Sequence, residues 1–551
     1  MSHRVRHLSG IFAVVFSVAM IPAMLFSTVS AGAITSSSVI TAPPLPTLTS
    51  LAGAEGFPYD AVPQTPLVTN APYFPLGTLG YVENEYLMSG TTNIYRQSGF
   101  WSSNGQWNVS VAQSNVPYTT NLLVRYPTTA RFNGTVVIEW SNIITGGDQD
   151  PVWSEIDNEL LTNGYAYMLV TPQNGGMNEL KTWDPVRYAA LGDTNDGQSY
   201  DIFTEAAEAA RADTDNVLGR LTVKNVIGVA DSESVFRLDT YVNAFQPLFH
   251  AFTGFMGVGR SALAAPLTGN AIFGTTFPAQ IRTNNTAPFI QVNSQGDILE
   301  LDAAAARQPD NTDLRTWEVA GAAHIDIHET EYELETIGRG NPTVPVPDCI
   351  FGTPVSGGPA VLNGLNQTNN MSFFEVEDAA IADLQNWLVN GVPAPHESSY
   401  LSAIPLFFGL FYIPSTNQYG ISSGGIQLPE AQVPTEDYGQ INFSVLDTTT
   451  LNVTSIVSEL EDILNTLTNG VMTNPAVRAD GLCMLNGYFT NLSTSQLTAL
   501  YPTTASYIAK YTAAANALVK AGFLTQQDAT AAIANAAAGY GPSQQPPETI
   551  P

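Results

Sequence analysis

The middle of the chain alternates short apolar runs with longer segments in which apolar and polar residues recur at helical spacing. The apolar runs predict buried strands at Thr135–Trp140, Tyr165–Val170, Val226–Val229, Phe252–Val258, Pro288–Val292 and Thr316–Val319. The segments between and after them predict helices at Val152–Leu161, Tyr200–Ala212, Val235–Phe245, Leu299–Arg307 and Phe374–Leu388. Strands and helices that alternate in this way predict an α/β fold, with a mostly parallel sheet covered by helices on both faces.

The pattern differs on both sides of this middle part. Residues 34–75 are rich in Pro, Ser and Thr and predict a flexible arm, while the alternating runs within Gly80–Tyr126 predict antiparallel strands. After about residue 400 the periodicity weakens, and helices are predicted again at Leu451–Leu467 and Ser495–Ala538. We therefore expect a core over 76–400 and a helical C-terminal region over 401–551 that packs on the core as a cap or flank.

The first 33 residues have the pattern of a secretory signal peptide. Arg4 and Arg6 precede the apolar stretch Ile11–Phe26, and Ala31–Ala33 offers small residues for cleavage. An uncleaved membrane anchor is the alternative. The later apolar stretch Ile404–Ile413 is too short to span a bilayer. We expect a secreted or periplasmic protein with no stable membrane span after cleavage.

Charge and cysteine content narrow the classes of partner. The 551 residues carry 19 basic and 49 acidic side chains, for a formal net charge of −30. Such a surface repels nucleic acid, so a nucleic-acid partner is not expected. The two cysteines, Cys349 and Cys483, can form a disulfide in an oxidising compartment, although two unpaired buried cysteines remain the alternative.

A candidate nucleophile lies at the end of one predicted strand. Asn225–Ser234 runs from apolar residues into Ala-Asp-Ser-Glu-Ser, and a predicted helix follows. This is the local pattern of a nucleophile elbow, where a serine occupies a tight strand-to-helix turn between small residues. Ser232 is the candidate, with Ala230 and Ser234 at positions where the usual pattern has glycine.

A serine hydroxyl needs a base, and the base needs an orienting carboxylate. His324 follows a predicted strand and a run of small residues, and Asp297 lies in the predicted loop after an earlier strand. The order Ser, Asp, His along the chain is that of α/β-hydrolases. Glu300 and Asp302 are the alternatives for the acid.

Backbone N–H groups are the expected stabilisers of an oxyanion. One should be the amide of Glu233, directly after the serine. The other should come from the loop Ser141–Gly147 after the first parallel strand, with Asn142 as the candidate.

A metal site is the competing interpretation of the histidine segment. His324, Asp326 and His328 would share one face of an extended segment, but no further His or Cys cluster supplies a second set of ligands. No phosphate-binding glycine pattern is present. We expect neither a cofactor nor a metal.

Several segments carry a resemblance to a known family. They are Phe132–Trp140, Ser199–Phe203, Arg237–Ala244, Trp317–His324, Gly424–Ile426, Leu482–Met484 and Leu500–Pro502. Through them the chain resembles the large secreted or periplasmic proteins of the alpha/beta hydrolase domain family, from about residue 80 to about 540. The resemblance implies an α/β-hydrolase fold that includes the C-terminal region. It implies Ser232 as nucleophile, with Ala230 in place of the family's glycine, His324 as base and Asp297 as acid.

The sequence thus predicts a secreted serine hydrolase that cleaves a small or polymeric carboxylic ester through an acyl-enzyme. The alternative is a catalytically weak or inactive binding protein on the same scaffold, because the acids Asp231 and Glu233 flank the serine and would oppose an oxyanion if they point toward it.

Overall fold

The computed structural model describes residues 40–51, 76–127, 131–144, 148–192, 195–212, 216–330, 332, 368–406, 409, 411–442 and 484–538. The predicted signal peptide, most of the predicted arm, Cys349, Cys483 and the predicted helix Leu451–Leu467 lie outside these residues. Within the described part of the chain, no helix is long and apolar enough to cross a membrane.

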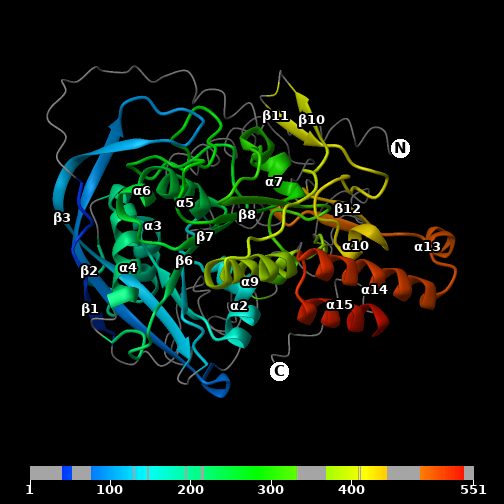
Figure 1. The fold of residues 1–551 in the computed structure, drawn as a ribbon, viewed down its shortest axis with the longest axis horizontal. Coiled ribbons are helices and arrows are strands. Elements are labelled where there is room, and N and C mark those ends of the chain that lie inside the picture. Colours follow the sequence, from blue (N-terminus) through cyan, green and yellow to red (C-terminus); the bar gives the residue numbers. More distant parts are fainter. Residues whose placement is uncertain are drawn as a thin grey trace.

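A large sheet forms the centre of the molecule (Figure 1). Its strand order is β1-β2-β3-β5-β4-β6-β7-β8-β9, and every pair from β5 to β9 is parallel. The parallel strands are β4 (Thr135–Trp140), β5 (Ala166–Val170), β6 (Asn225–Asp231), β7 (Gly254–Val258), β8 (Phe289–Ser294) and β9 (Leu314–Val319). The predicted parallel sheet is confirmed, because these β-branched and aromatic runs are buried on both faces.

The strand order reverses direction at β4. The chain leaves β4 for β5 on one side, and β6 then pairs with β4 on the other side. Connections that leave in opposite directions open a crevice at the carboxyl ends of the two strands, which is where ligands bind in such sheets.

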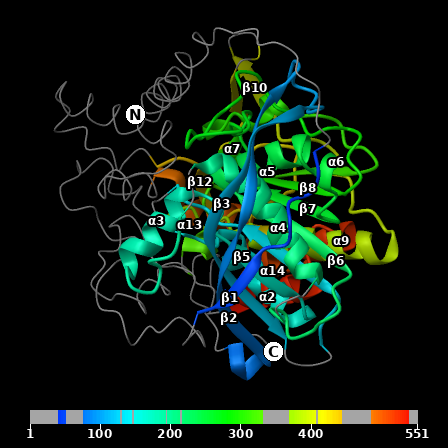
Figure 2. The same cartoon turned by 90° about the vertical axis from the view of Figure 1, so that its left-hand side faces the viewer.

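Two long strands extend one edge of the sheet. β2 (Tyr81–Ser98) and β3 (Asn108–Pro127) pair along their whole length, β1 (Thr47–Ser50) adds to β2, and β3 joins β5 antiparallel. The antiparallel pairing was predicted, but not the length. The register of the pair is irregular near Ile94, which interrupts the alternation of apolar and polar residues, but both strands continue beyond this point. Figure 2 shows these long strands, in blue, on the side of the molecule that faces the viewer.

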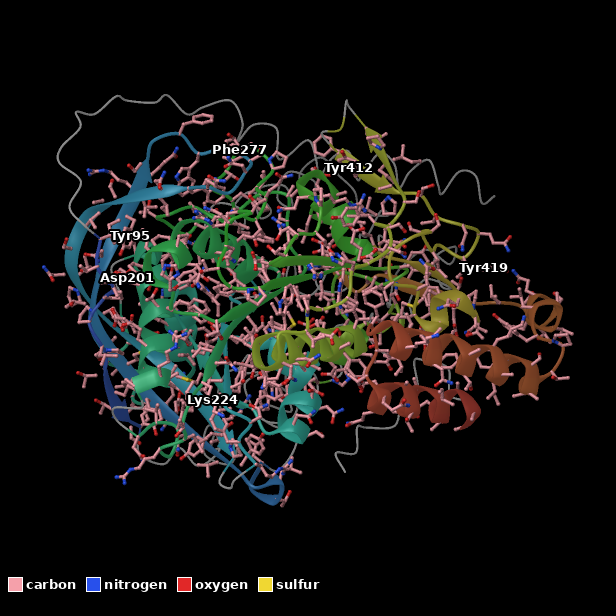
Figure 3. All side chains as sticks on the ribbon, in the orientation of Figure 1. Tyr95, Asp201, Lys224, Phe277, Tyr412 and Tyr419 are labelled. Atoms are coloured by element: carbon pink, nitrogen blue, oxygen red, sulfur yellow. The ribbon has the colours of Figure 1, made fainter. Side chains whose placement is uncertain are left out.

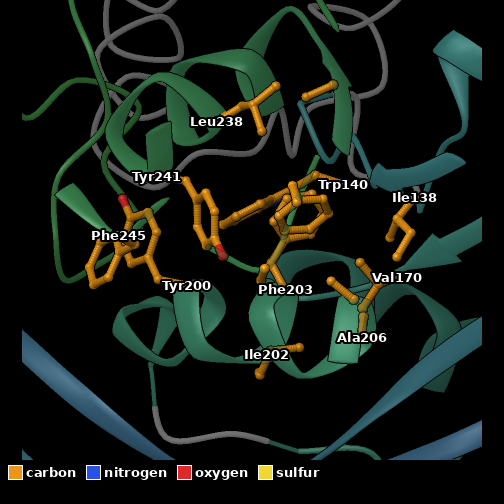
Figure 4. Close-up of a cluster of buried hydrophobic side chains, with 14 of the residues drawn as sticks. Ile138, Trp140, Val170, Tyr200, Ile202, Phe203, Ala206, Leu238, Tyr241 and Phe245 are labelled. Atoms are coloured by element: carbon orange, nitrogen blue, oxygen red, sulfur yellow. The ribbon is translucent and has the colours of Figure 1, made fainter. Parts of the chain in front are cut away.

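Helices cover both faces. One face carries α4 (Ser199–Ala212) and α5 (Glu233–Ala244), followed by the short α6 (Gln246–Phe249); α3 (Asn174–Trp183) lies between β5 and α4 in the chain. Aromatic rings fill this layer. They include Trp140, Tyr200, Phe203, Tyr241 and Phe245, with Tyr200 and Phe245 stacked at 4.6 Å (Figure 4).

The opposite face carries α2 (Pro151–Asn163) and α9 (Phe374–Asn390). α2 begins with proline, which needs no hydrogen bond from its nitrogen in the first turn. It ends at Gly164, whose left-handed conformation is favourable for glycine.

The predicted helix Leu299–Arg307 is misplaced. α7 spans Gln295–Glu300 because Ser294 and Asp297 form a capping box that starts it early. Asp302 then adopts a left-handed conformation with φ of 55°, and a separate 3-10 turn follows at Ala303–Ala306.

The described part of the C-terminal region consists of short strands and of helices of 4 to 18 residues. They are β10 (Ala403–Leu406), β11 (Phe411–Pro414), α10 (Pro429–Gln432), β12 (Glu436–Gly439), β13 (Tyr488–Asn491), α13 (Thr494–Leu500), α14 (Thr504–Ala521) and α15 (Gln526–Ala538). The helices predicted over Ser495–Ala538 are therefore confirmed as three helices.

These elements share the core of the sheet. The ring of Phe523 lies edge-on to Trp317 of β9 at 5.1 Å, and Gln527 of α15 donates a hydrogen bond to Asn158 of α2 at 3.1 Å. Figure 3 shows Tyr412 and Tyr419 of this region on the side of the molecule away from Tyr95 and Asp201, which join β2 to α4 through a 2.7 Å hydrogen bond.

Candidate active site

Ser232 occupies a strained turn between β6 and α5. Its φ of 51° and ψ of −119° are unusual for a residue with a side chain. Its N–H donates to the carbonyl of Val258 at 3.0 Å, and its carbonyl accepts the N–H of Val235 at 3.1 Å. The turn thus places the hydroxyl at the carboxyl end of the parallel strands.

Close packing around the turn explains the small residues that the pattern requires. Ala230 and Ser234 are fully buried. The Ser234 hydroxyl donates to the carbonyl of Asp231 at 2.8 Å and accepts its N–H at 3.1 Å. On the next strand, a Cβ on Gly257 would lie 2.6 Å from a methyl group of Val235, so only glycine lets α5 approach this closely. The helix begins at Glu233, two residues earlier than predicted.

The three candidate residues meet in space. The Oγ of Ser232 lies 2.9 Å from Nε2 of His324, and Nδ1 of the same ring lies 2.5 Å from Oδ1 of Asp297. They come from three places that are distant in the chain: the end of β6, the loop after β9, and α7 after β8. A hydroxyl, an imidazole and a carboxylate in this series can transfer a proton from the serine to the ring.

Asp297 is held in place by its own helix. Its Oδ2 accepts the N–H of Ser294 at 2.6 Å, and its N–H donates to Ser294 Oγ at 3.2 Å. Asp297 therefore lies in the first turn of α7, whereas the sequence predicted a loop at this position. Of the alternatives, Glu300 has no hydrogen-bond partner for either carboxyl oxygen among the residues that the structure describes, and Asp302 accepts the N–H of Tyr412 at 3.0 Å.

The ring of His324 is buried among carboxylates. Burial disfavours the charged imidazolium, but the carboxylate of Asp297, assisted by Glu300 and Asp231, outweighs it and raises the pKa of His324 to about 9. The neutral ring, which can accept a proton, therefore becomes more abundant as pH rises toward this value.

One of the two predicted oxyanion donors fits. Glu233 is the first residue of α5, so its N–H has no partner within the helix, and no acceptor for it lies among the described residues. Asn142 is a correction. Its N–H donates to the carbonyl of Gln149 at 2.9 Å in a closed bridge, so it is not available to a substrate.

Asn142 instead braces the crevice. Its side chain donates to the carbonyl of Asp231 at 3.0 Å, which joins the ends of β4 and β6, and its Oδ1 accepts the N–H of Ile144 at 2.9 Å. Residues 145–147 of the same predicted loop lie outside the described residues.

The acid after the serine points away from it. The carboxyl group of Glu233 accepts a hydrogen bond from Gln173 Nε2 at 3.0 Å and lies 3.9 Å from the guanidinium of Arg237, which also faces Asp196 at 3.7 Å. Burial raises the pKa of Glu233 to about 7, and the charge of Arg237 opposes that rise. Gln173 was not singled out in the sequence, and Arg237 was noted only as the start of the segment Arg237–Ala244, because no motif connects either residue to the serine.

His324, Asp326 and His328 do not form a ligand set. His324 is occupied by Ser232 and Asp297. Asp326 accepts a hydrogen bond from the Ser372 hydroxyl at 2.7 Å and receives the N–H groups of Phe373 and Phe374 at the start of α9, while the ring of His328 stacks on Phe374 at 4.2 Å. In the described part of the chain, no group of three or more His, Cys, Asp or Glu residues is arranged to hold a metal ion.

Comparison with known proteins places the chain among relatives. The sequence model described as "Alpha/beta hydrolase domain" matches residues 44–462 and 463–534, which is most of the chain. No curated protein matches it significantly.

Solved structures with a similar arrangement include three bacterial proteins. A serine hydrolase homologue from Coxiella burnetii is 10% identical, with a TM-score of 0.25 over 40% of this chain and 91% of that chain. A serine hydrolase without a lid from Xanthomonas campestris is 11% identical, with a TM-score of 0.27 over 41% and 92%. A dienelactone hydrolase from Anabaena variabilis is 14% identical, with a TM-score of 0.23 over 44% and 95%. These values are too low to carry a conclusion about the reaction.

Proposed function

The chain belongs to the alpha/beta hydrolase domain family, and within that family we propose that it is a serine hydrolase that cleaves carboxylic esters. The observation that carries the proposal is the continuous series of contacts from Ser232 Oγ through the ring of His324 to Asp297. The series lies at the carboxyl ends of the parallel strands, beside the point where the strand order reverses.

The proposed reaction has two halves. The Oγ of Ser232 attacks the acyl carbon while Nε2 of His324 takes its proton, and the resulting tetrahedral intermediate then expels the alcohol, which receives that proton. Water repeats the sequence on the acyl-enzyme: it gives its proton to Nε2, attacks the acyl carbon, and the released Ser232 regains the proton. Asp297 keeps the proton of the ring on Nδ1 and stabilises the charged ring in both halves.

The amide of Glu233 is proposed to stabilise the oxyanion. Its N–H begins α5, so the positive end of the helix dipole adds to the hydrogen bond. The carboxyl group of Glu233 contacts Gln173 and Arg237. The backbone N–H of this residue is therefore proposed to face the oxyanion, while its side-chain charge is bound elsewhere.

Esters are preferred to amides on chemical grounds. An alkoxide leaves more readily than an amine anion, so an ester needs less proton donation from the charged ring when its leaving group departs. The fold by itself does not decide between the two, because it hosts many reactions. Export and the removal of residues 1–33 remain part of the proposal.

The first test is the substitution Ser232→Ala. Turnover of p-nitrophenyl esters should fall by at least about 10⁴-fold, while the thermal melt stays near that of the wild type because alanine has a similar size. A fluorophosphonate probe should label the wild type on the Ser232 peptide and should leave Ser232→Ala unlabelled. Ser234→Ala is the matched control, since the Ser234 hydroxyl is bound to the backbone of Asp231; it should still be labelled.

Turnover that survives in Ser232→Ala would remove this serine from the mechanism. A folded wild type that neither labels nor cleaves any ester in a panel of graded acyl lengths would instead favour the inactive binding protein.

A further inference from the structure

Asp231 is the last residue of β6 and directly precedes the proposed nucleophile. Its backbone is fixed on both sides, since its carbonyl accepts hydrogen bonds from Asn142 and Ser234 and its N–H donates to Ser234. Its side chain is only partly exposed, and no Lys or Arg among the described residues forms an ion pair with it. A carboxylate of this kind beside a reaction centre requires an explanation.

Gly259 shows what the carboxylate faces. This glycine follows β7 with a φ of +62°. A Cβ built on it would lie 3.0 Å from Cε1 and 3.4 Å from Nδ1 of His324, and 3.2 Å from Oδ1 of Asp231. The ring and the carboxylate therefore border the same small space, which stays open because residue 259 has no side chain.

We propose that Asp231 is a positioning residue that acts through His324: a second carboxylate, placed at the Cε1 edge of the ring, which stabilises the imidazolium without a direct hydrogen bond. This inference rests on the proposed function. Asp231 then helps to set the pH above which the ring of His324 is neutral. Asp297 has a separate role, because it fixes which nitrogen of the ring carries the proton.

Three other buried acids lie close to the ring or to Asp231. Among the described residues, the carboxyl oxygens of Glu300 on α7, Glu155 on α2 and Glu377 on α9 have no hydrogen-bond partner and are sealed from solvent. Burial raises the pKa of each well above its usual range. Burial, with a further contribution from Asp297, raises the pKa of Asp231 to about 7, against the lowering effect of His324. Asp231 therefore gains its negative charge in the working range of pH.

The sign of the effect follows from the role of the base. Turnover needs the neutral ring, so activity rises with pH through the pKa of His324. A negative charge beside the ring favours its protonated form and moves this rise to higher pH. Removing the charge should move the rise to lower pH.

The experiment compares Asp231→Asn with Glu300→Gln. The substitution Asp231→Asn keeps the shape of the side chain and removes its charge, and Glu300→Gln does the same for the other carboxyl group that, besides Asp297, raises the pKa of His324. The kcat/KM profile of Asp231→Asn on a p-nitrophenyl ester should have its acid limb about one pH unit lower than the wild type. The limb of Glu300→Gln should also move to lower pH, because Glu300 raises the pKa of His324 as well. Asp231→Ala, as a second uncharged variant, should shift in the same direction.

A second readout does not need turnover. In protein labelled with ¹³C at histidine Cε1, the His324 resonance, assigned by its loss in His324→Ala, should titrate at lower pH in Asp231→Asn. An unchanged titration and an unchanged limb in a folded variant would overturn the inference. If the resonance shifts while no variant or wild type turns over ester, the proposed function fails and the electrostatic role of Asp231 stands.

Discussion

The two partners in the Ser232–His324 contact are held in different ways. The turn that carries Ser232 is almost self-contained: Asp231, Ser234 and Val235 supply most of its hydrogen bonds. Two partners come from neighbouring strand ends, the carbonyl of Val258 and the side chain of Asn142. The chain has only to bury β6 and start α5 for this turn to form.

The loop that carries His324 depends on distant residues. Gln295 accepts the N–H of Gly321 at 2.9 Å, Asn369 and Gln440 both donate to the carbonyl of Gly321, and the N–H of Ile325 donates to Leu485. These contacts span from α7 to the region before β13. A nucleophile can thus be built by about ten consecutive residues, whereas its base is oriented by residues spread over nearly two hundred positions of the chain.

The largest expected effect tests the base side alone. Asp297→Asn removes the carboxylate from Nδ1 of His324 and leaves the turn of Ser232 unchanged. We expect kcat on p-nitrophenyl esters to fall by about 10³- to 10⁴-fold, because the ring is free to adopt the wrong tautomer. The melt should fall slightly, since an aspartate of the capping box is lost. Near wild-type turnover would transfer the acid role to another carboxylate, with Glu300 as the first to examine.

A smaller effect is expected from loosening the loop at a distance from the chemistry. Gln295 is fully buried; its Oε1 accepts N–H groups from Gly321 and Ser422, and its Nε2 donates to the carbonyl of Gly420 at 2.8 Å. Gln295→Ala leaves these groups unpaired and should cost about 2–4 kcal/mol of stability, measured by chemical denaturation. We expect kcat to fall by about tenfold with little change in KM.

The control for this substitution is Gln432→Ala, an exposed glutamine that donates one hydrogen bond, to Gln427. It should change stability by less than about 0.5 kcal/mol. If the two variants lost the same amount of kcat, the loop would not depend on Gln295, and the contrast between the two sides would be wrong.

The smallest effect belongs to the turn itself. Ser234→Ala removes one hydroxyl that bridges the N–H and carbonyl of Asp231. The cost should be about 1 kcal/mol, and kcat should stay within about threefold of wild type, because Val258 and Val235 still hold the serine. A loss as large as that of Gln295→Ala would show that the turn is not self-contained.

The same contrast explains what the sequence could predict. Runs such as Thr135–Trp140 are buried on both faces and mark their strands directly, and the apolar-to-small transition before Ser232 marks the turn. The order of Ser232, Asp297 and His324 then limited the base and acid to a few candidates.

Features that depend on loop closure were missed or misplaced. The sequence predicted the N–H of Asn142 as an oxyanion donor. In the structure the loop folds back on itself, and this N–H is bound to the carbonyl of Gln149. No sequence motif marks Gln295 or Gly259, because each acts through residues that are distant along the chain. Asp297 was placed in a loop because the capping box with Ser294 was not recognised, although the two residues lie three apart as such a box requires.

The contacts of the His324 loop also set limits on how such proteins can be recombined. β9 continues into a parallel bridge between Val319 and Ile426, and Asn369 and Asn486 are joined by a backbone hydrogen bond. A chimaera that took its first 400 residues from one relative and its tail from another would inherit an intact serine but a base whose supports had been selected against a different partner. In directed evolution, crossovers should therefore be tolerated best when the strand ends and the tail are exchanged together.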